Sequence, residues 1–179
     1  MGNGKHWIQT YTGKQFFYDD IDSNDIDIRD VAHALSNIPR FAGHMKKFYS
    51  VAEHSVNVAR LCSTKGKKSD MWGLLHDASE AYISDIPKPM KWAVPEIVTY
   101  ELKIQIAVRK AFDITFDDDI EDIVDWADLL MLITERYKGF DFIIPWGYYE
   151  DIEPANMELK FLSPNEAERE FLKIYSMLT

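Results

Sequence analysis

The stretch Ser50-Val-Ala-Glu-His-Ser-Val-Asn-Val-Ala-Arg-Leu-Cys62 carries the clearest helix signal of the chain. Ser50 followed three residues later by Glu53 is the pattern of a capping box, in which each side chain caps the backbone N–H of the other residue. Behind this box the apolar residues recur at helical spacing, at Val51, Val58, Leu61 and Cys62. His54 falls on the same face, so the stretch predicts an amphipathic helix whose buried side includes an imidazole.

Helical periodicity continues through most of the chain and predicts an all-α fold, a compact helical bundle in a single domain over residues 1–179. The stretch Trp7–Tyr18 has a β-like pattern around Gly13, which is compatible with a short N-terminal β-hairpin. Pro87 and Pro89 are expected to exclude helix across Ile86–Pro89. We expect the other helices from Asp27 to Pro39, from Ser69 to Tyr82, from Pro95 onward, from Asp117 onward and from Ser163 onward, with an ordered loop over Phe140–Pro154.

Composition and charge narrow the classes of function. The net charge of −10 argues against a binder of nucleic-acid polymers, which would need a basic surface, but it allows a small anionic ligand. No apolar run approaches the roughly 18–20 residues needed to cross a bilayer, and the first seven residues lack a signal-peptide core. The single cysteine, Cys62, is expected in the core. These features predict a cytoplasmic protein without a membrane partner.

Three predicted helices place ionisable side chains on a face that should be buried: His54, the pair His76-Asp77, and Asp128. Taken singly, a histidine in such a place is usually a hydrogen-bonded core residue, and an aspartate usually caps a neighbouring helix. Together, two carboxylates and two imidazoles without partners would cost several kcal/mol for each buried charge. A shared divalent cation removes that cost, so the sequence predicts one metal site that suits Mn²⁺, Fe²⁺, Co²⁺ or Zn²⁺.

Two further carboxylates lie close to the predicted ligands in the sequence. Glu80 is four residues after His76 and three after Asp77, so a helix would place it on the same side. In an ordinary helix such a glutamate faces solvent, whereas beside a metal site it is a candidate general acid or base. Asp85 is either a helix-stop residue or a second carboxylate at the mouth of the site.

The order Glu53-His54-Ser55, then His76-Asp77, then Asp128 within Trp126-Ala-Asp-Leu resembles the ligand pattern of the HD-domain phosphohydrolases. The segments His76-Asp-Ala-Ser-Glu80 and Asp85-Ile-Pro-Lys-Pro-Met-Lys91 are similar to those of bacterial HD-domain 5′-deoxynucleotidases and phage-type dATP triphosphohydrolases. The similarity covers roughly residues 28–137 and implies an HD-domain helical bundle. By this resemblance one transition metal is bound by His54, His76, Asp77 and Asp128, Glu80 and Asp85 act in catalysis, and the nucleotide contacts the pair Arg40-Phe41, where the relatives have Arg-Trp.

The resemblance implies hydrolysis of a 2′-deoxynucleotide, and two outcomes stay open. A deoxynucleoside triphosphate such as dATP would give the deoxynucleoside and tripolyphosphate, and would bring Mg²⁺ as a second ion. A deoxynucleoside monophosphate would give the deoxynucleoside and orthophosphate. Because substrate adds negative charge to an acidic pocket, we expect Arg40, and after it Lys88 and Lys91, to bind phosphate. A homo-oligomer is also expected.

Other interpretations remain beside this one. A metal-bound HD domain can be a regulatory or interaction module without turnover, although such a module has no need of Glu80, Asp85 and Arg40. A (p)ppGpp-type hydrolase shares the metal ligands but is expected in a longer, differently marked domain. No histidine follows His76, so the extra ligands of two-metal HD enzymes are missing from the sequence. His33 is expected to be structural, and His44 is a weaker candidate to reach the pocket.

Overall fold

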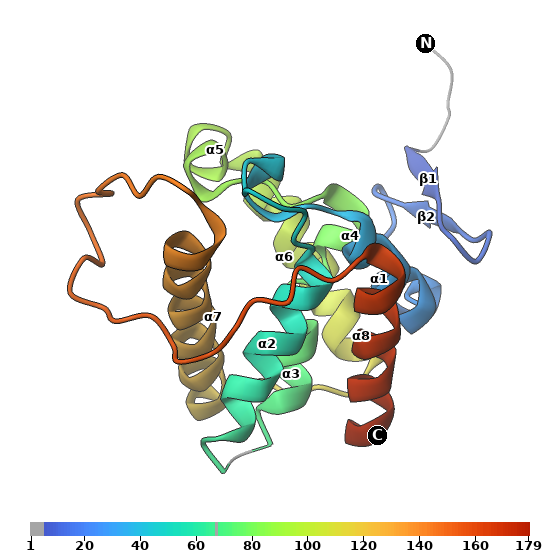
Figure 1. Cartoon of the computed structure of the whole chain (residues 1–179). Coiled ribbons are helices and arrows are strands. Elements are labelled where there is room, and N and C mark those ends of the chain that lie inside the picture. Colours follow the sequence, from blue (N-terminus) through green and yellow to red (C-terminus); the bar gives the residue numbers. More distant parts are fainter. Residues whose placement is uncertain (1–5, 67) are drawn as a thin grey trace.

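A computed structural model describes residues 6–66 and 68–179 of the chain. The protein is mainly helical, with a two-stranded antiparallel sheet near the N-terminus (Figure 1). This confirms the helical class and the hairpin, while the assignment to the HD domain stays a prediction. The elements are β1 (Trp7–Gln9), β2 (Gln15–Phe17), the 3₁₀ helices η1 (Ser23–Asp25) and η2 (Arg40–Gly43), α1 (Ile28–Asn37), α2 (Val51–Ser63), α3 (Asp70–Leu75), α4 (Glu80–Ile83), α5 (Lys88–Ala93), α6 (Glu96–Ala111), α7 (Asp118–Gly139) and α8 (Pro164–Leu178).

Several helices begin where their sequence signals predict. Asp27 caps α1 by accepting a hydrogen bond from the N–H of Arg29, and Asp117 caps α7 in the same manner. The capping box of Ser163 and Glu166 is complete at the start of α8. Short polar side chains at these positions accept bonds from backbone N–H groups that have no partner inside the helix.

The single helix expected from Ser69 to Tyr82 is wrong. The chain forms α3 and α4 with a tight turn between them, in which the N–H of Ala78 bonds the carbonyl of Leu75 and the N–H of Glu80 bonds that of Asp77. These bonds span three residues rather than four, as in a 3₁₀ helix. Apolar spacing over so few residues cannot distinguish 3.0 from 3.6 residues per turn, which is why the sequence did not reveal the turn.

The expected exclusion of helix across Ile86–Pro89 is also wrong at its C-terminal end. Helix α5 begins at Lys88 and contains Pro89, with Pro87 as its N-cap residue. Proline is tolerated there because the N–H groups of the first turn have no intrahelical acceptor. Pro95, expected within the first turn of the next helix, is instead the N-cap residue of α6.

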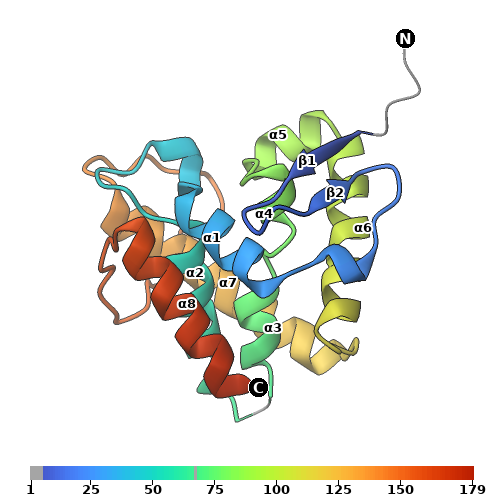
Figure 2. The ribbon, with the colours of Figure 1, turned by 90° about the vertical axis from the view of Figure 1, so that its right-hand side faces the viewer.

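Helix α2 is the central element of the bundle and packs against α3, α7 and α8 (Figure 1). Cys62 on α2 is fully buried, as predicted, and a Cβ on Gly73 of α3 would lie 2.8 Å from its Sγ, so the two helices approach closely there. The hairpin covers α4, where the rings of Phe16 and Tyr82 stack at 4.0 Å (Figure 2). Within the described residues, no helix has both the length and the apolar character to span a membrane.

The predicted capping box at the start of α2 forms only in part. Ser50 accepts a hydrogen bond from the N–H of Glu53 at 3.1 Å, as expected. The buried carboxylate of Glu53 reaches the segment before α8 and accepts three backbone N–H bonds, of 2.9, 3.1 and 2.7 Å, from Lys160, Phe161 and Leu162. Glu53 therefore fastens the connection between α7 and α8 to the central helix.

Replacing Glu53 with alanine leaves these three N–H groups without their acceptor. We expect Glu53→Ala to lower the free energy of unfolding by about 3 kcal/mol or more, because each buried group that loses its partner costs about 1–3 kcal/mol. Urea unfolding measures this loss, and hydrogen exchange should become faster at Lys160–Leu162. The exposed Glu158→Ala is the control, and equal stability of the two variants would contradict this role of Glu53.

Candidate metal centre

Side chains from α2 and from the turn after α3 converge on one point. The Nε2 atoms of His54 and His76 are 3.4 Å apart, and the Oδ2 atom of Asp77 lies 3.5 Å from the first and 3.3 Å from the second. Donor atoms about 2.0–2.2 Å from a tetrahedrally bound ion lie roughly 3.3–3.6 Å from one another. The separations of these three atoms match that range, so His54, His76 and Asp77 form a group that could hold a metal ion.

Asp128, on α7, lies close to the same two imidazoles. Its Oδ1 atom lies 3.1 Å from Nε2 of His54 and 3.9 Å from Nε2 of His76. Although loss of hydration opposes it, the neighbouring imidazoles hold the pKa of Asp128 well below its ordinary value. The Asp128 side chain keeps 44% of its exposure, so the cluster is open to solvent on this side. Its role as a fourth ligand stays a prediction.

Both imidazoles are held through their other ring nitrogen. Nδ1–H of His76 donates to the carbonyl of Gly73 at 2.9 Å, and Nδ1–H of His54 donates to Oε1 of Glu135 at 2.6 Å. In each ring Nε2 then faces the cluster, and once this nitrogen is deprotonated the ring is the tautomer that a metal requires. Sequence reasoning missed Glu135. Its position seven residues after Asp128, about two turns further along the same helix face, was the available signal.

Arg40 lies beside the cluster, while its contact with a nucleotide stays a prediction. Its buried guanidinium donates from Nε to Oε2 of Glu135 at 3.0 Å, and its Nη1 is 3.5 Å from Oδ2 of Asp77. The next two residues, Phe41 and Ala42, have φ angles of 52° and 50°, in the left-handed region. The Phe41 ring packs edge-on against Phe140 with centroids 5.3 Å apart, so it is partly covered by the start of the loop after α7.

Glu80 is buried next to the cluster. Its Oε2 atom has no hydrogen-bond partner within the described part of the chain, and its Oε1 atom is 3.8 Å from Nζ of Lys91. Burial, followed by the charges of Asp77 and Asp85, raises the pKa of Glu80 well above its ordinary value. Burial likewise raises the pKa of Asp85. Burial of Glu80 therefore favours the protonated form of its carboxyl group.

The lysines and the two other histidines considered in the sequence differ in their surroundings. Lys91 donates from Nζ to Glu101 at 2.6 Å, so its charge already has one partner, while Lys88 is exposed at the start of α5. The ring of His33 stacks on Tyr11, with centroids 3.8 Å apart, and its Nδ1 is hydrogen-bonded to Glu168. These contacts fit the structural role expected for His33. His44 is exposed at the end of η2.

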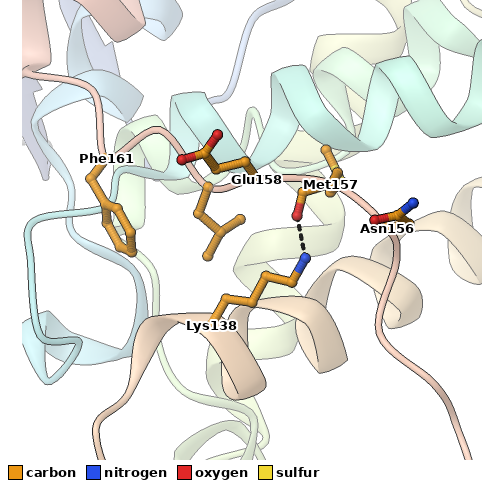
Figure 3. A pocket seen from close by; sticks show the side chains of 6 residues that line it. Lys138, Asn156, Met157, Glu158 and Phe161 are labelled. Atoms are coloured by element: carbon orange, nitrogen blue, oxygen red, sulfur yellow. Dashed lines mark hydrogen bonds between the residues drawn. The ribbon is translucent and has the colours of Figure 1, made fainter.

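Two hollows lie away from the cluster. A cavity of about 420 Å³ opens between the end of α7 and the segment before α8, where it is lined by Lys138, Asn156–Leu159 and Phe161 (Figure 3). The Lys138 ammonium donates hydrogen bonds to the backbone carbonyls of Ala155 and Met157. A smaller cavity of about 250 Å³ lies under the hairpin, against α1 and α4. Neither is lined by the His and Asp cluster, whose donor atoms converge on one point.

No family model matches the chain. The chain is similar to the uncharacterized protein YfdR of Escherichia coli strain K12, with 39% identity over 176 residues that cover 97% of this chain and 96% of YfdR. It is also similar to an uncharacterized protein of Rhodobacter capsulatus, with 34% identity over 94 residues that cover 49% of this chain and 48% of that protein. Neither name states an activity, so arguments about function depend on the site.

The charges around His54 predict how metal affinity changes with pH. Burial and Arg40 lower the pKa of His54, but Glu135 and Asp128 outweigh them and raise that pKa to about 9. Below that pH the metal-free imidazole carries a proton on Nε2 that a metal must displace, so we expect affinity to rise by about tenfold per pH unit between about pH 7 and 8.5. Titration calorimetry with Co²⁺ in buffers of different ionisation enthalpy measures the released proton. Binding that is independent of pH and releases no proton would contradict the arrangement.

Proposed function

The chain belongs to the family of the Escherichia coli protein YfdR, and we propose that it is a metal-dependent phosphohydrolase of the HD-domain type. The observation that carries the proposal is the convergence of His54, His76 and Asp77 beside a buried carboxyl group, that of Glu80. A non-catalytic metal module would give no reason to bury Glu80 with an unpartnered oxygen, since such burial is costly.

The proposed cofactor is one divalent transition metal, held by His54, His76, Asp77 and Asp128. Two imidazole nitrogens and two carboxylate oxygens suit Mn²⁺, Fe²⁺, Co²⁺ or Zn²⁺. A divalent cation bound there supplies positive charge to the phosphoryl group and lowers the pKa of a coordinated water. The donor set supports this fit, because the two Nε2 atoms and Oδ2 of Asp77 converge and Oδ1 of Asp128 lies 3.1 Å from Nε2 of His54.

The proposed substrate is a 2′-deoxynucleotide, a choice that rests on the resemblance of the motifs around His76 and Asp85. The cationic groups nearest to the cluster, Arg40 and Lys91, both have carboxylate partners already. A bound monophosphate needs fewer additional positive charges for neutralisation than a triphosphate does. A triphosphate would bring Mg²⁺ with it. Both product patterns, orthophosphate and tripolyphosphate, stay part of the proposal.

Glu80 is the proposed general acid. Burial raises the pKa of this carboxyl group and favours its protonated form, which would donate the proton to the ester oxygen that leaves with the nucleoside. Lys91, 3.8 Å away, would then stabilise the carboxylate that remains. Asp85, also half-buried and with a raised pKa, is the second candidate for this role.

A phosphate-release screen tests the proposal. Deoxy- and ribonucleoside mono-, di- and triphosphates are incubated with the protein and Mn²⁺, Co²⁺, Zn²⁺ or Mg²⁺, and the products are identified by mass. We expect release of orthophosphate or tripolyphosphate from a deoxynucleotide and much slower turnover of the matching ribonucleotide. Equal turnover of dAMP and AMP, or of dATP and ATP, would remove the deoxy preference. Failure to hydrolyse any nucleotide with every metal would remove the proposal.

Two variants in the same screen separate metal binding from proton transfer. Glu80→Ala should keep its metal and bind nucleotide, yet lose about 10²–10⁴-fold in rate, the usual contribution of a positioned general acid. Asp128→Ala should lose both metal and activity while it stays folded. Full activity of Glu80→Ala would contradict the role given to this carboxyl group.

A further inference from the structure

Glu135 is a buried carboxylate on α7 whose two oxygens bind two different parts of the site. Its side chain is fully buried, with no exposed surface. Oε1 accepts from Nδ1–H of His54 at 2.6 Å, and Oε2 accepts from Nε–H of Arg40 at 3.0 Å. Because both bonds involve charged groups, they are among the stronger hydrogen bonds that a protein can form.

The contact with His54 sets which ring nitrogen faces the metal group. An ionised carboxylate can only accept a hydrogen bond, so Glu135 keeps the hydrogen of His54 on Nδ1. Nε2 of His54 is then directed at His76 and Asp77. The other imidazole, His76, has a neutral partner, the carbonyl of Gly73. Of the two imidazoles, it is therefore His54 whose orientation depends on a charged side chain, that of Glu135.

The contact with Arg40 sets the direction of the guanidinium. Arg40 begins the left-handed turn of η2, and its Nε is directed at Glu135 while Nη1 lies 3.5 Å from Asp77. A guanidinium that lost the bond to Glu135 would keep the longer contact with Asp77 but would lose the charge-assisted hydrogen bond that fixes its Nε. Arg40 therefore depends on Glu135 for its direction beside Asp77.

From these contacts we propose that Glu135 is a positioning residue which fixes both the metal-facing tautomer of His54 and the substrate-facing guanidinium of Arg40. The substrate half rests on the proposed function, whereas the metal half does not. Loss of the Glu135 charge should weaken metal binding and substrate binding together. The contact of the proton donor Glu80 with Lys91, at 3.8 Å, does not involve Glu135 and should persist.

The test compares Glu135→Gln with Glu121→Gln. Glu121 is on the same helix and also pairs with a buried arginine, Arg109, at 2.7 Å, so its variant breaks a comparable pair away from the cluster. We expect Glu135→Gln to weaken Co²⁺ binding by about 10–100-fold, as loss of an outer-shell partner does. At saturating metal its KM should rise at least about tenfold, the cost of a lost charge-assisted bond, with a smaller change in kcat. Glu121→Gln should keep the wild-type Co²⁺ affinity and KM.

Further measurements keep the two halves apart. Arg40→Met should keep Co²⁺ affinity within a few-fold of wild type and raise KM alone. If Glu135→Gln fails to fold, Glu135→Asp takes its place, since the shorter side chain keeps the charge but cannot span both partners. Wild-type Co²⁺ affinity and KM in the folded Glu135 variant, or equal losses in Glu121→Gln, would overturn the inference. If the wild-type protein hydrolyses no nucleotide, the proposed function fails, while the Co²⁺ titration still decides the metal half.

Discussion

A buried imidazole must satisfy both of its ring nitrogens, and the structure around His54 meets this constraint at the centre of the bundle. One nitrogen requires a carboxylate from α7, and the other requires the donor group formed by His76, Asp77 and Asp128. Helices α2 and α7 must consequently pack in a fixed register, because Glu135 and Asp128 contact the same ring from positions two turns apart. The charge of Glu135 in turn requires Arg40, which brings the segment before α2 into the site.

Unusual backbone conformations surround this centre. Phe41 and Ala42 adopt left-handed angles directly after Arg40, and Ser84 has a φ of 71° between Glu80 and Asp85. Residues other than glycine rarely adopt such angles, and each one costs of order 1–3 kcal/mol unless the surrounding structure enforces it. Their position next to Arg40 and Asp85 in the chain fits a site whose side chains are placed by packing rather than by local preference.

Much of the site could be predicted from single-helix periodicity. His54 and Asp128 interrupt apolar stripes, so the conflict between their polarity and their predicted burial was visible in the sequence. Glu135 was missed because α7 is rich in acidic residues, and a glutamate there resembles a solvent-facing charge until its partners are known. The local capping pattern predicted the bond from the N–H of Glu53 to Ser50. It could not predict the N–H groups that bind the carboxylate of Glu53, because they lie more than a hundred positions further along the chain. The turn between α3 and α4 involves too few residues for periodicity to reveal it.

We propose that one metal ion binds where the imidazoles of His54 and His76 meet Asp77 and Asp128. Anomalous diffraction from crystals grown with Mn²⁺ or Co²⁺ would locate this ion. We expect one strong peak within about 2.0–2.3 Å of both Nε2 atoms and of an oxygen from each aspartate. At saturating metal, a map without a peak at this point, with Nε2 of His54 still hydrogen-bonded to Asp128, would contradict it.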